Sequence, residues 1–175
     1  MGCPVCAGKV IVSGENDFAS RFPAIAAQWH PTRNGSLMPN HISPFSNRKV
    51  WWQCELGHAY IAAVSARTMH HSGCPYCTGR KVLVGFNDLA SLQPRVAAQW
   101  HPTLNGTLTP EMVTTGSHKK VWWECPEGHV WKAVIHSRAG IRKCNCPVCA
   151  GKVRADRAER YTAALAAQSK GNNAK

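Results

Sequence analysis

Two Cys-x3-His turns, each followed by a Cys-Pro-x-Cys sequence, constrain the fold of this chain more than any other feature. The spacing is Cys-x3-His-x15-Cys-x2-Cys in the first set and Cys-x3-His-x16-Cys-x2-Cys in the second. A tetrahedral zinc ion takes four sulfur or nitrogen ligands, and two short chelating turns supply two each. The sequence therefore predicts two zinc ions per chain, held by Cys54, His58, Cys74 and Cys77 and by Cys125, His129, Cys146 and Cys149.

Four protein ligands at each predicted site leave no coordination position for water, which is typical of structural rather than catalytic zinc. The sequence also has no paired carboxylates, Gly-rich phosphate loop or nucleophile–base pair. We therefore expect that the protein is not an enzyme. Since only 8% of the 175 residues are aromatic, each small unit needs the metal to supply folding free energy that its core lacks.

The chain is a tandem repeat, because residues 3–67 align without a gap on residues 74–138 at an offset of 71. If each unit ends with its Cys-Pro-x-Cys, the two complete units are residues 9–79 and 80–151. Residues 1–8 then end a preceding unit whose Cys-x3-His half is absent. Residues 152–175 form a basic tail that is expected to be helical or frayed.

The orphan Cys-Pro-x-Cys of residues 1–8 has two interpretations. Cys3 and Cys6 are either an unmetallated remnant of a longer array or a third metal half-site. In the second case the missing ligands come from Cys144 and a nearby His, or from the same pair in a second molecule. A half-site shared between two molecules would make the protein a dimer through Cys3 and Cys6.

Turn signals and apolar periodicity predict a small α+β fold of tandem zinc-stapled units, each a β-hairpin with a Cys/His knuckle plus short helices. In the second unit we expect a strand at 82–84, a helical turn at 89–92 capped by Asn87 or Asp88, and a helix at 95–100. A further single turn is expected at 109–111. The hairpin strands are expected at 119–124 and 130–135, with the knuckle between them.

Adjacent tryptophans recur in the first strand of each predicted hairpin, as Trp51–Trp52 and Trp122–Trp123. Neighbouring residues of a strand point to opposite faces, so one tryptophan of each pair should pack over the zinc site. We expect core packing for the pair; in the alternative, the other tryptophan is partly exposed and can stack on a base or anchor a partner. His30 and His101 are expected to be hydrogen-bonded at a helix end rather than bound to metal, because each site already has four ligands.

The net charge is +12 at pH 7 and the isoelectric point is near 9.6, which indicates a polyanionic partner. We expect nucleic acid, double-stranded DNA above all, bound mainly through its phosphate backbone. The candidate contacts are Arg48, Lys49, Arg67, Lys119, Lys120, Arg138 and Arg142. For Arg67 and Arg138, an internal interaction is an equal alternative. The competing functions are a protein-interaction scaffold and an adaptor for a separately encoded nuclease.

The nine cysteines occur mostly in metal-ligand spacing, and the N-terminus has no charged-then-apolar leader. Both features favour reduced thiolates in the cytoplasm. No apolar run approaches the roughly 18 residues that a membrane helix needs, so no membrane partner is expected.

The repeated motifs resemble a known family, the tandem probable zinc-ribbon (treble-clef-like) domains of bacterial and phage-like proteins. The resemblance rests on Cys-Pro-x-Cys-x-Gly, Asn-Asp-Leu-Ala, Trp-His-Pro, Lys-Val-Trp-Trp-x-Cys and Gly-His, and it covers nearly all of residues 3–151. The eight predicted ligands fall where the presumed zinc ligands of that family fall. The resemblance implies a metal-binding module of treble-clef or ribbon type, which is often found beside nuclease-like domains and is presumed to bind nucleic acid.

Overall fold

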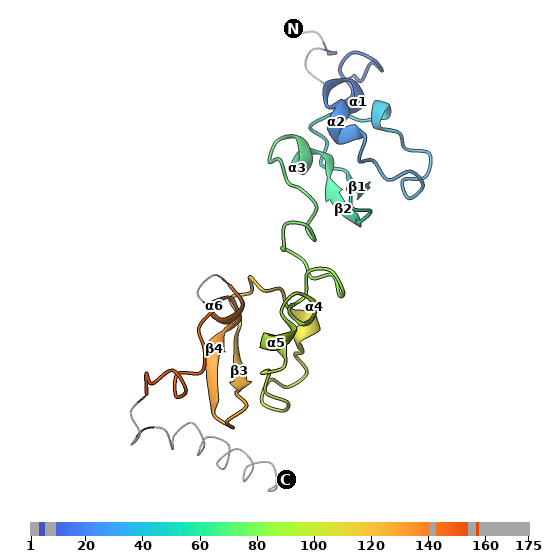
Figure 1. Cartoon of the computed structure of the whole chain (residues 1–175). Helices are drawn as coiled ribbons and strands as arrows, with labels where there is room; N and C mark the ends of the chain where they lie inside the picture. Colours follow the sequence, from blue (N-terminus) through green and yellow to red (C-terminus); the bar gives the residue numbers. More distant parts are fainter. Residues whose placement is uncertain (1–3, 6–9, 141–142, 154–156, 158–175) are drawn as a thin grey trace, which may run out of the picture. The chain divides into compact units, whose positions relative to one another are not determined.

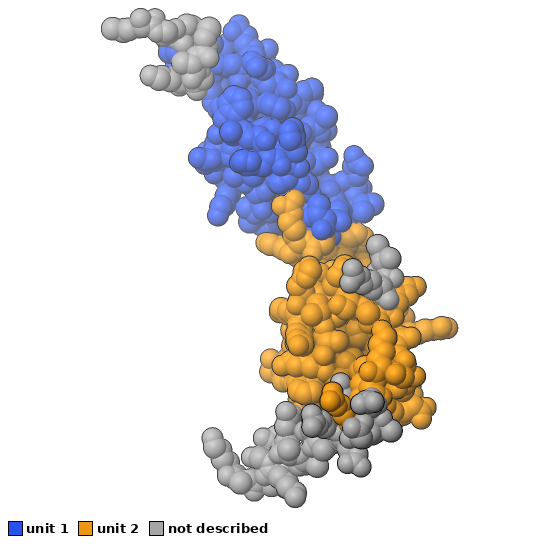
Figure 2. All heavy atoms as spheres, turned by 90° about the vertical axis from the view of Figure 1, so that its left-hand side faces the viewer, with its two compact units in different colours: residues 1–78 blue, residues 79–175 orange. Residues whose placement is uncertain are grey.

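The computed structural model describes residues 4–5, 10–140, 143–153 and 157. The chain divides into two compact units, residues 1–78 and 79–175, drawn in blue and orange in Figure 2. Cys3, Cys6, Arg142 and nearly all of the tail at 152–175 lie outside the described residues. The metal half-site, the dimer and the helical tail therefore stay predictions.

The two units contain the same elements in the same order (Figure 1). In the first unit these are α1 (Phe18–Arg21), α2 (Pro23–Ala26), the 3-10 turn η1 (Pro39–His41), β1 (Lys49–Gln53), β2 (Ala59–Ala63) and α3 (Val64–Thr68). In the second unit they are α4 (Leu89–Leu92), α5 (Pro94–Ala97), the 3-10 turn η2 (Pro110–Met112), β3 (Lys120–Glu124), β4 (Val130–Val134) and α6 (Ile135–Ala139). This arrangement confirms the predicted small α+β fold with one hairpin per unit.

The short helices begin where the sequence provides a cap. The Asp88 carboxylate accepts the backbone amide of Ser91 at 2.8 Å and so caps α4, as predicted. Burial opposes ionisation of this carboxyl, but hydrogen bonds from Ser91 and Gly85 outweigh it and lower the pKa of Asp88. Pro94 occupies the first position of α5. Proline has no amide hydrogen, but at this position the helix would not use one in an intrahelical hydrogen bond. The helix ends at Ala97, three residues before the predicted end.

The predicted strand at 82–84 is wrong, because this segment forms no strand and leads into a turn. The Asn87 side chain accepts the amide of Leu83 at 2.7 Å and donates to the carbonyl of Lys81 at 2.8 Å. These are hydrogen bonds that a neighbouring strand would otherwise make, so the apolar run is held as a loop by a local side chain.

Each hairpin is antiparallel, with Trp52 opposite Tyr60 in the first unit and Trp123 opposite Trp131 in the second. The outer edge of β1 is covered by the segment after α2, since Gln53 donates its amide to the Gln28 carbonyl at 2.8 Å. The predicted strand at 130–135 ends one residue early, and Ile135 begins α6.

The tryptophan pairs alternate faces as predicted. Trp52 and Trp123 are 0% exposed, whereas Trp51 and Trp122 are half-buried. The indole nitrogen of Trp52 donates to the Ala62 carbonyl at 3.0 Å. The ring also packs edge-to-face with that of Phe18, with 5.7 Å between the ring centres. Since Phe18 belongs to α1, this helix packs on the inner face of the hairpin.

His30 and His101 are hydrogen-bonded rather than grouped with the metal ligands, as predicted, but they lie four residues beyond the ends of α2 and α5 and not at a helix end. Nδ1 of His30 accepts the backbone amide of Thr32 at 3.3 Å, and Nδ1 of His101 accepts that of Thr103 at the same distance. Both imidazoles are buried, and neither belongs to a metal cluster. In the part of the chain that the structure describes, no helix has the length and hydropathy to cross a bilayer.

Candidate metal centres

The first half of each metal centre is the tip of a hairpin. Cys54 follows β1 and His58 precedes β2, and the Cys54 amide donates to the His58 carbonyl at 3.1 Å. Gly57 donates back to the Cys54 carbonyl at 2.8 Å, with a φ of 81° that favours glycine. The turn is therefore tight enough to bring the Cys sulfur and the His ring to the same side. Gly128 has the same role in the second unit, with a φ of 75°.

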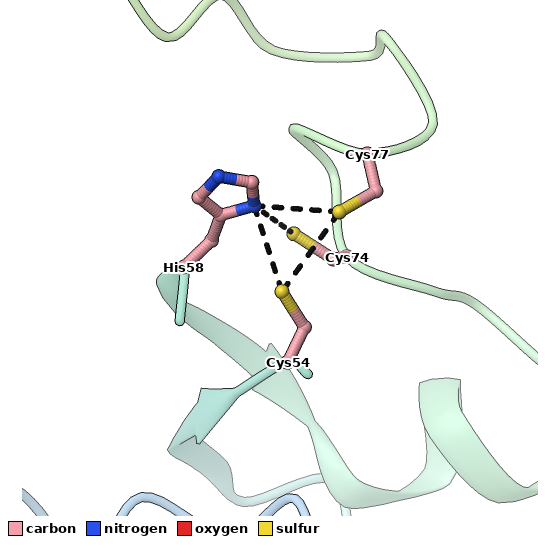
Figure 3. Close-up of side chains that lie close together, drawn as sticks. All are labelled: Cys54, His58, Cys74 and Cys77. Carbon is pink, nitrogen blue, oxygen red and sulfur yellow. Dashed lines mark hydrogen bonds between the residues drawn. The ribbon is translucent and has the colours of Figure 1, made fainter. Parts of the chain in front are cut away.

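The second half is the Cys-Pro-x-Cys turn, which lies beyond α3 or α6 in the chain. In the first unit the Thr78 amide donates to the Cys74 carbonyl at 3.0 Å, closing one turn that carries both Cys74 and Cys77. Figure 3 shows the two sulfurs of this turn facing the Cys54 sulfur and one nitrogen of the His58 ring. Ligands from two distant segments thus converge on one point.

The spacing between ligand atoms fits a tetrahedral zinc ion. Bond lengths of about 2.3 Å to sulfur and 2.0–2.1 Å to nitrogen place two sulfurs about 3.8 Å apart and a sulfur about 3.5 Å from the nitrogen. In the first unit the sulfurs of Cys54 and Cys77 are 3.8 Å apart. Nδ1 of His58 lies 3.5, 3.3 and 3.8 Å from the sulfurs of Cys54, Cys77 and Cys74.

The second centre repeats this geometry with a different loop length. The sulfurs of Cys125 and Cys149 are 3.7 Å apart, and Nδ1 of His129 lies 3.4 Å from each. With Cys146, the four ligand atoms all lie within 4.8 Å of one another, as they do in the first centre. The extra residue before Cys146 is accommodated without loss of the ligand set.

The thiolate form of each cluster is stable only beside a cation. Burial and the neighbouring thiols raise the pKa of Cys77 to about 12, and the same causes raise that of Cys149 to about 12. Three thiolates this close repel one another unless a metal ion neutralises them. Zinc supplies two positive charges against three thiolates, so each filled centre carries a net charge of −1.

The structure corrects two of the predicted nucleic-acid contacts. Arg67 and Arg138 are only 6% and 4% exposed, and their guanidinium groups are engaged inside the units. For both arginines the structure shows the internal interaction, which the sequence had left as an equal alternative. The other described candidates are exposed at the surface: Arg48, Lys49, Lys119 and Lys120.

Two cations that the sequence reasoning missed lie over the outward-facing tryptophans. The guanidinium of Arg33 is 4.7 Å from the ring centre of Trp51, and Nζ of Lys132 is 5.5 Å from that of Trp122. Lys132 lies directly opposite Trp122 in the hairpin. The pairing of the two strands on either side of the Cys-x3-His turn would have predicted this contact. No sequence signal indicates Arg33, which reaches Trp51 from a loop.

Cys144 is described by the structure but is not a member of either ligand cluster. Its backbone amide donates to the Ser137 carbonyl at 2.9 Å, and its carbonyl accepts a hydrogen bond from Arg138 at 3.0 Å. The backbone of Cys144 thus fixes the loop that leads into the second Cys-Pro-x-Cys turn.

Comparison with known proteins agrees with the geometry of the clusters. A family model described as a probable treble clef zinc finger domain matches the chain twice, at residues 25–80 and 96–152. Each match contains one complete ligand set and ends just after its Cys-Pro-x-Cys turn. No curated protein matches the chain.

Proposed function

The chain belongs to the probable treble clef zinc finger domain family, and on that premise we propose that its two zinc-stapled units bind double-stranded DNA, mainly through the phosphate backbone. Zinc binding gives each unit its shape, and the surface of the hairpin makes the contact. The observation that carries this function is a cationic and aromatic surface that recurs in both units, together with the net charge of +12.

This surface, here named the outer hairpin face, lies opposite the buried Trp52 or Trp123. In the first unit it consists of Lys49, Trp51 and Arg33, and in the second of Lys120, Trp122 and Lys132. Lys49 and Trp51 share a face because they are two positions apart in β1. All four cations are exposed.

The composition of the outer hairpin face favours a phosphate-bearing partner. Lys and Arg neutralise backbone phosphates, and the released counterions drive association. A half-buried tryptophan adds a flat surface for a sugar or a base. The cation–π contact keeps the positive charge next to the indole, so one part of the nucleic acid can bind both groups.

We further propose that the module acts without catalysis. The Cys and His side chains fill all four positions of a tetrahedral zinc ion in each unit, so no position is left for a reacting water. The zinc ions stabilise the fold, and any chemistry on the bound nucleic acid would come from a separate protein.

A salt series tests this function. We expect the zinc-loaded protein to bind labelled duplex DNA with micromolar or tighter affinity at physiological salt. The logarithm of affinity should fall steeply with the logarithm of salt concentration, since several phosphates are neutralised. Single-stranded DNA and RNA of the same sequence are measured beside the duplex. Tighter binding of either would replace duplex DNA as the substrate, and no binding at low salt would favour a protein-interaction scaffold or a nuclease adaptor.

A charge-reversal variant locates the contact. Replacing Lys49→Glu and Lys120→Glu together should weaken duplex binding at least tenfold and reduce the salt slope by about 2, because two phosphate contacts are lost. The matched control is Arg21→Glu with Arg95→Glu, which changes the net charge equally. These exposed arginines belong to α1 and α5 and are not among the residues of the outer hairpin face.

Fluorescence anisotropy with labelled duplex measures both variants. An equal loss of affinity in the control pair would show that binding follows total charge, and it would exclude the outer hairpin face as the site.

A further inference from the structure

Each unit buries one arginine beside its metal centre. Arg67 in α3 and Arg138 in α6 occupy equivalent positions in the two repeats, and both are among the most buried polar residues that the structure describes. A buried positive charge is strongly unfavourable unless a negative charge compensates it. Among the described residues, however, neither guanidinium has a carboxylate partner.

In the first unit the Arg67 guanidinium joins three parts of the fold. It donates to the side-chain oxygen of Gln28 at 2.6 Å and to the hydroxyl of Tyr60, and its central carbon lies 5.1 Å from the ring centre of Trp52. Nε of Arg67 has no hydrogen-bond partner although it is buried. Neutral groups therefore hold the guanidinium in place without balancing its charge.

The second unit keeps the buried arginine while changing what it contacts. Arg138 again donates to a glutamine, Gln99, but a tryptophan at position 131 replaces the tyrosine hydroxyl. The backbone carbonyl of Cys144 accepts the second hydrogen bond instead, at 3.0 Å. The buried guanidinium and its glutamine recur while the second hydrogen-bond acceptor changes, so burial of the charge does not depend on one fixed set of partners.

The cysteine ligands can supply the negative charge that compensates these arginines. An open cavity in the first unit is lined both by Arg67 and by three of the ligands, Cys54, Cys74 and Cys77. Burial lowers the pKa of Arg67, and the thiolates of Cys74 and Cys54 oppose that shift. For Arg138 burial has the same effect, opposed by the thiolates of Cys146, Cys144 and Cys125.

We propose that Arg67 and Arg138 are the counter-charges of the two zinc centres, each positioned to neutralise the net −1 charge of a zinc ion with three thiolates and one histidine. The free energy of zinc binding then depends on the buried arginine, and the burial of the arginine depends on the bound zinc. Without zinc the guanidinium lacks its anionic neighbour, and without the guanidinium the zinc centre has an unbalanced charge in a half-buried site. This role concerns the metal centre and is independent of nucleic-acid binding.

Zinc affinity of the full-length protein tests the proposal, with one unit as the control for the other. In Arg138→Met, the second centre should lose roughly 10–100-fold in zinc affinity, the range found for partners just outside the ligand shell, while the first centre keeps wild-type affinity. Competition with a chromogenic chelator measures both affinities. Alkylation of released cysteines, followed by mass spectrometry, identifies which centre has lost its metal.

Two further variants separate charge from hydrogen bonding. Arg138→Lys keeps the charge and should retain most of the zinc affinity. Gln99→Ala removes a hydrogen-bond acceptor of Arg138 but leaves the charge, so its zinc affinity should stay near that of the wild type. If Gln99→Ala weakens zinc as much as Arg138→Met, or if Arg138→Lys is as weak as Arg138→Met, the arginine acts through hydrogen bonding and the proposal is wrong.

Cobalt in place of zinc gives a readout that a purely structural role would not change. Removing a nearby positive charge raises the energy of the thiolate electrons, so the thiolate-to-cobalt charge-transfer band should move to longer wavelength in Arg138→Met. The band should remain unshifted in Gln99→Ala. An unshifted band in a folded, cobalt-loaded Arg138→Met protein would also overturn the proposal.

Discussion

Removal of zinc is expected to unfold both units. Each unit is built on short elements, the longest described helix or strand having five residues, and its hairpin tip and Cys-Pro-x-Cys turn come together at the metal ligands. Structural zinc contributes about 10–16 kcal/mol of apparent binding free energy in small zinc-finger peptides. That exceeds or matches the whole stability of about 5–15 kcal/mol that is typical of a folded domain. A strong chelator should therefore abolish the secondary-structure signal.

Circular dichroism and thermal melting with and without chelator measure this effect, and added zinc should restore the signal. An unchanged melting transition in protein that has been shown to contain no zinc would contradict the expectation.

A variant that lacks one metal centre tests whether each unit depends on its own zinc ion. Cys146→Ser with Cys149→Ser should reduce the zinc content from two ions to one. It should remove the folded signals of the second unit, and the first unit should keep its own, because each unit has a separate hydrophobic cluster. Loss of both units together would show that the first unit cannot fold alone.

Replacement of the buried tryptophan is expected to have the next largest effect. Trp52→Ala should destabilise the first unit by about 3–5 kcal/mol, which is the usual cost of truncating a large buried aromatic side chain. Trp52 is 0% exposed and contacts Phe18, Trp29 and Arg67. Its loss leaves a cavity at the centre of the cluster and removes the aromatic surface over which the guanidinium lies.

The adjacent tryptophan provides the matched control. Trp51 occurs in the same strand but faces outward under Arg33, so Trp51→Ala should destabilise the unit by no more than about 1 kcal/mol. On the proposed function it should weaken nucleic-acid binding. Denaturant unfolding of zinc-loaded protein compares the two variants, and similar destabilisation by both would mean that the outward tryptophan is also a core residue.

Short sequence patterns correctly predicted the features that depend on neighbouring residues: the metal ligands, the two faces of a strand and a helix cap. Ligand identity and spacing defined the two centres, since a Cys-x3-His turn and a Cys-x2-Cys turn each place two ligands within reach of one ion. Strand alternation correctly predicted that the two tryptophans of each pair face opposite sides, and the structure decided that Trp52 is the buried one. The Asp88 cap fixed the start of α4 because the carboxylate needs only an amide three residues away.

Short apolar runs did not predict strands reliably. The segment 82–84 had the composition of a strand, but the structure gives it no strand partner, and Asn87 takes its backbone hydrogen bonds. Whether such a run pairs depends on which other segment lies beside it, and composition does not contain that information.

The sequence by itself determined the ligand sets, the repeat, the hairpins and the alternation of each tryptophan pair, because these follow from local spacing and from comparing the two units. Only the tertiary structure decided the role of the arginines. Arg67 reaches Gln28 across 39 positions of chain, and Arg33 covers Trp51 from a separate loop. An arginine has the same charge and length in the interior as at the surface, so its neighbours in space decide whether it binds an external phosphate or balances a buried metal centre.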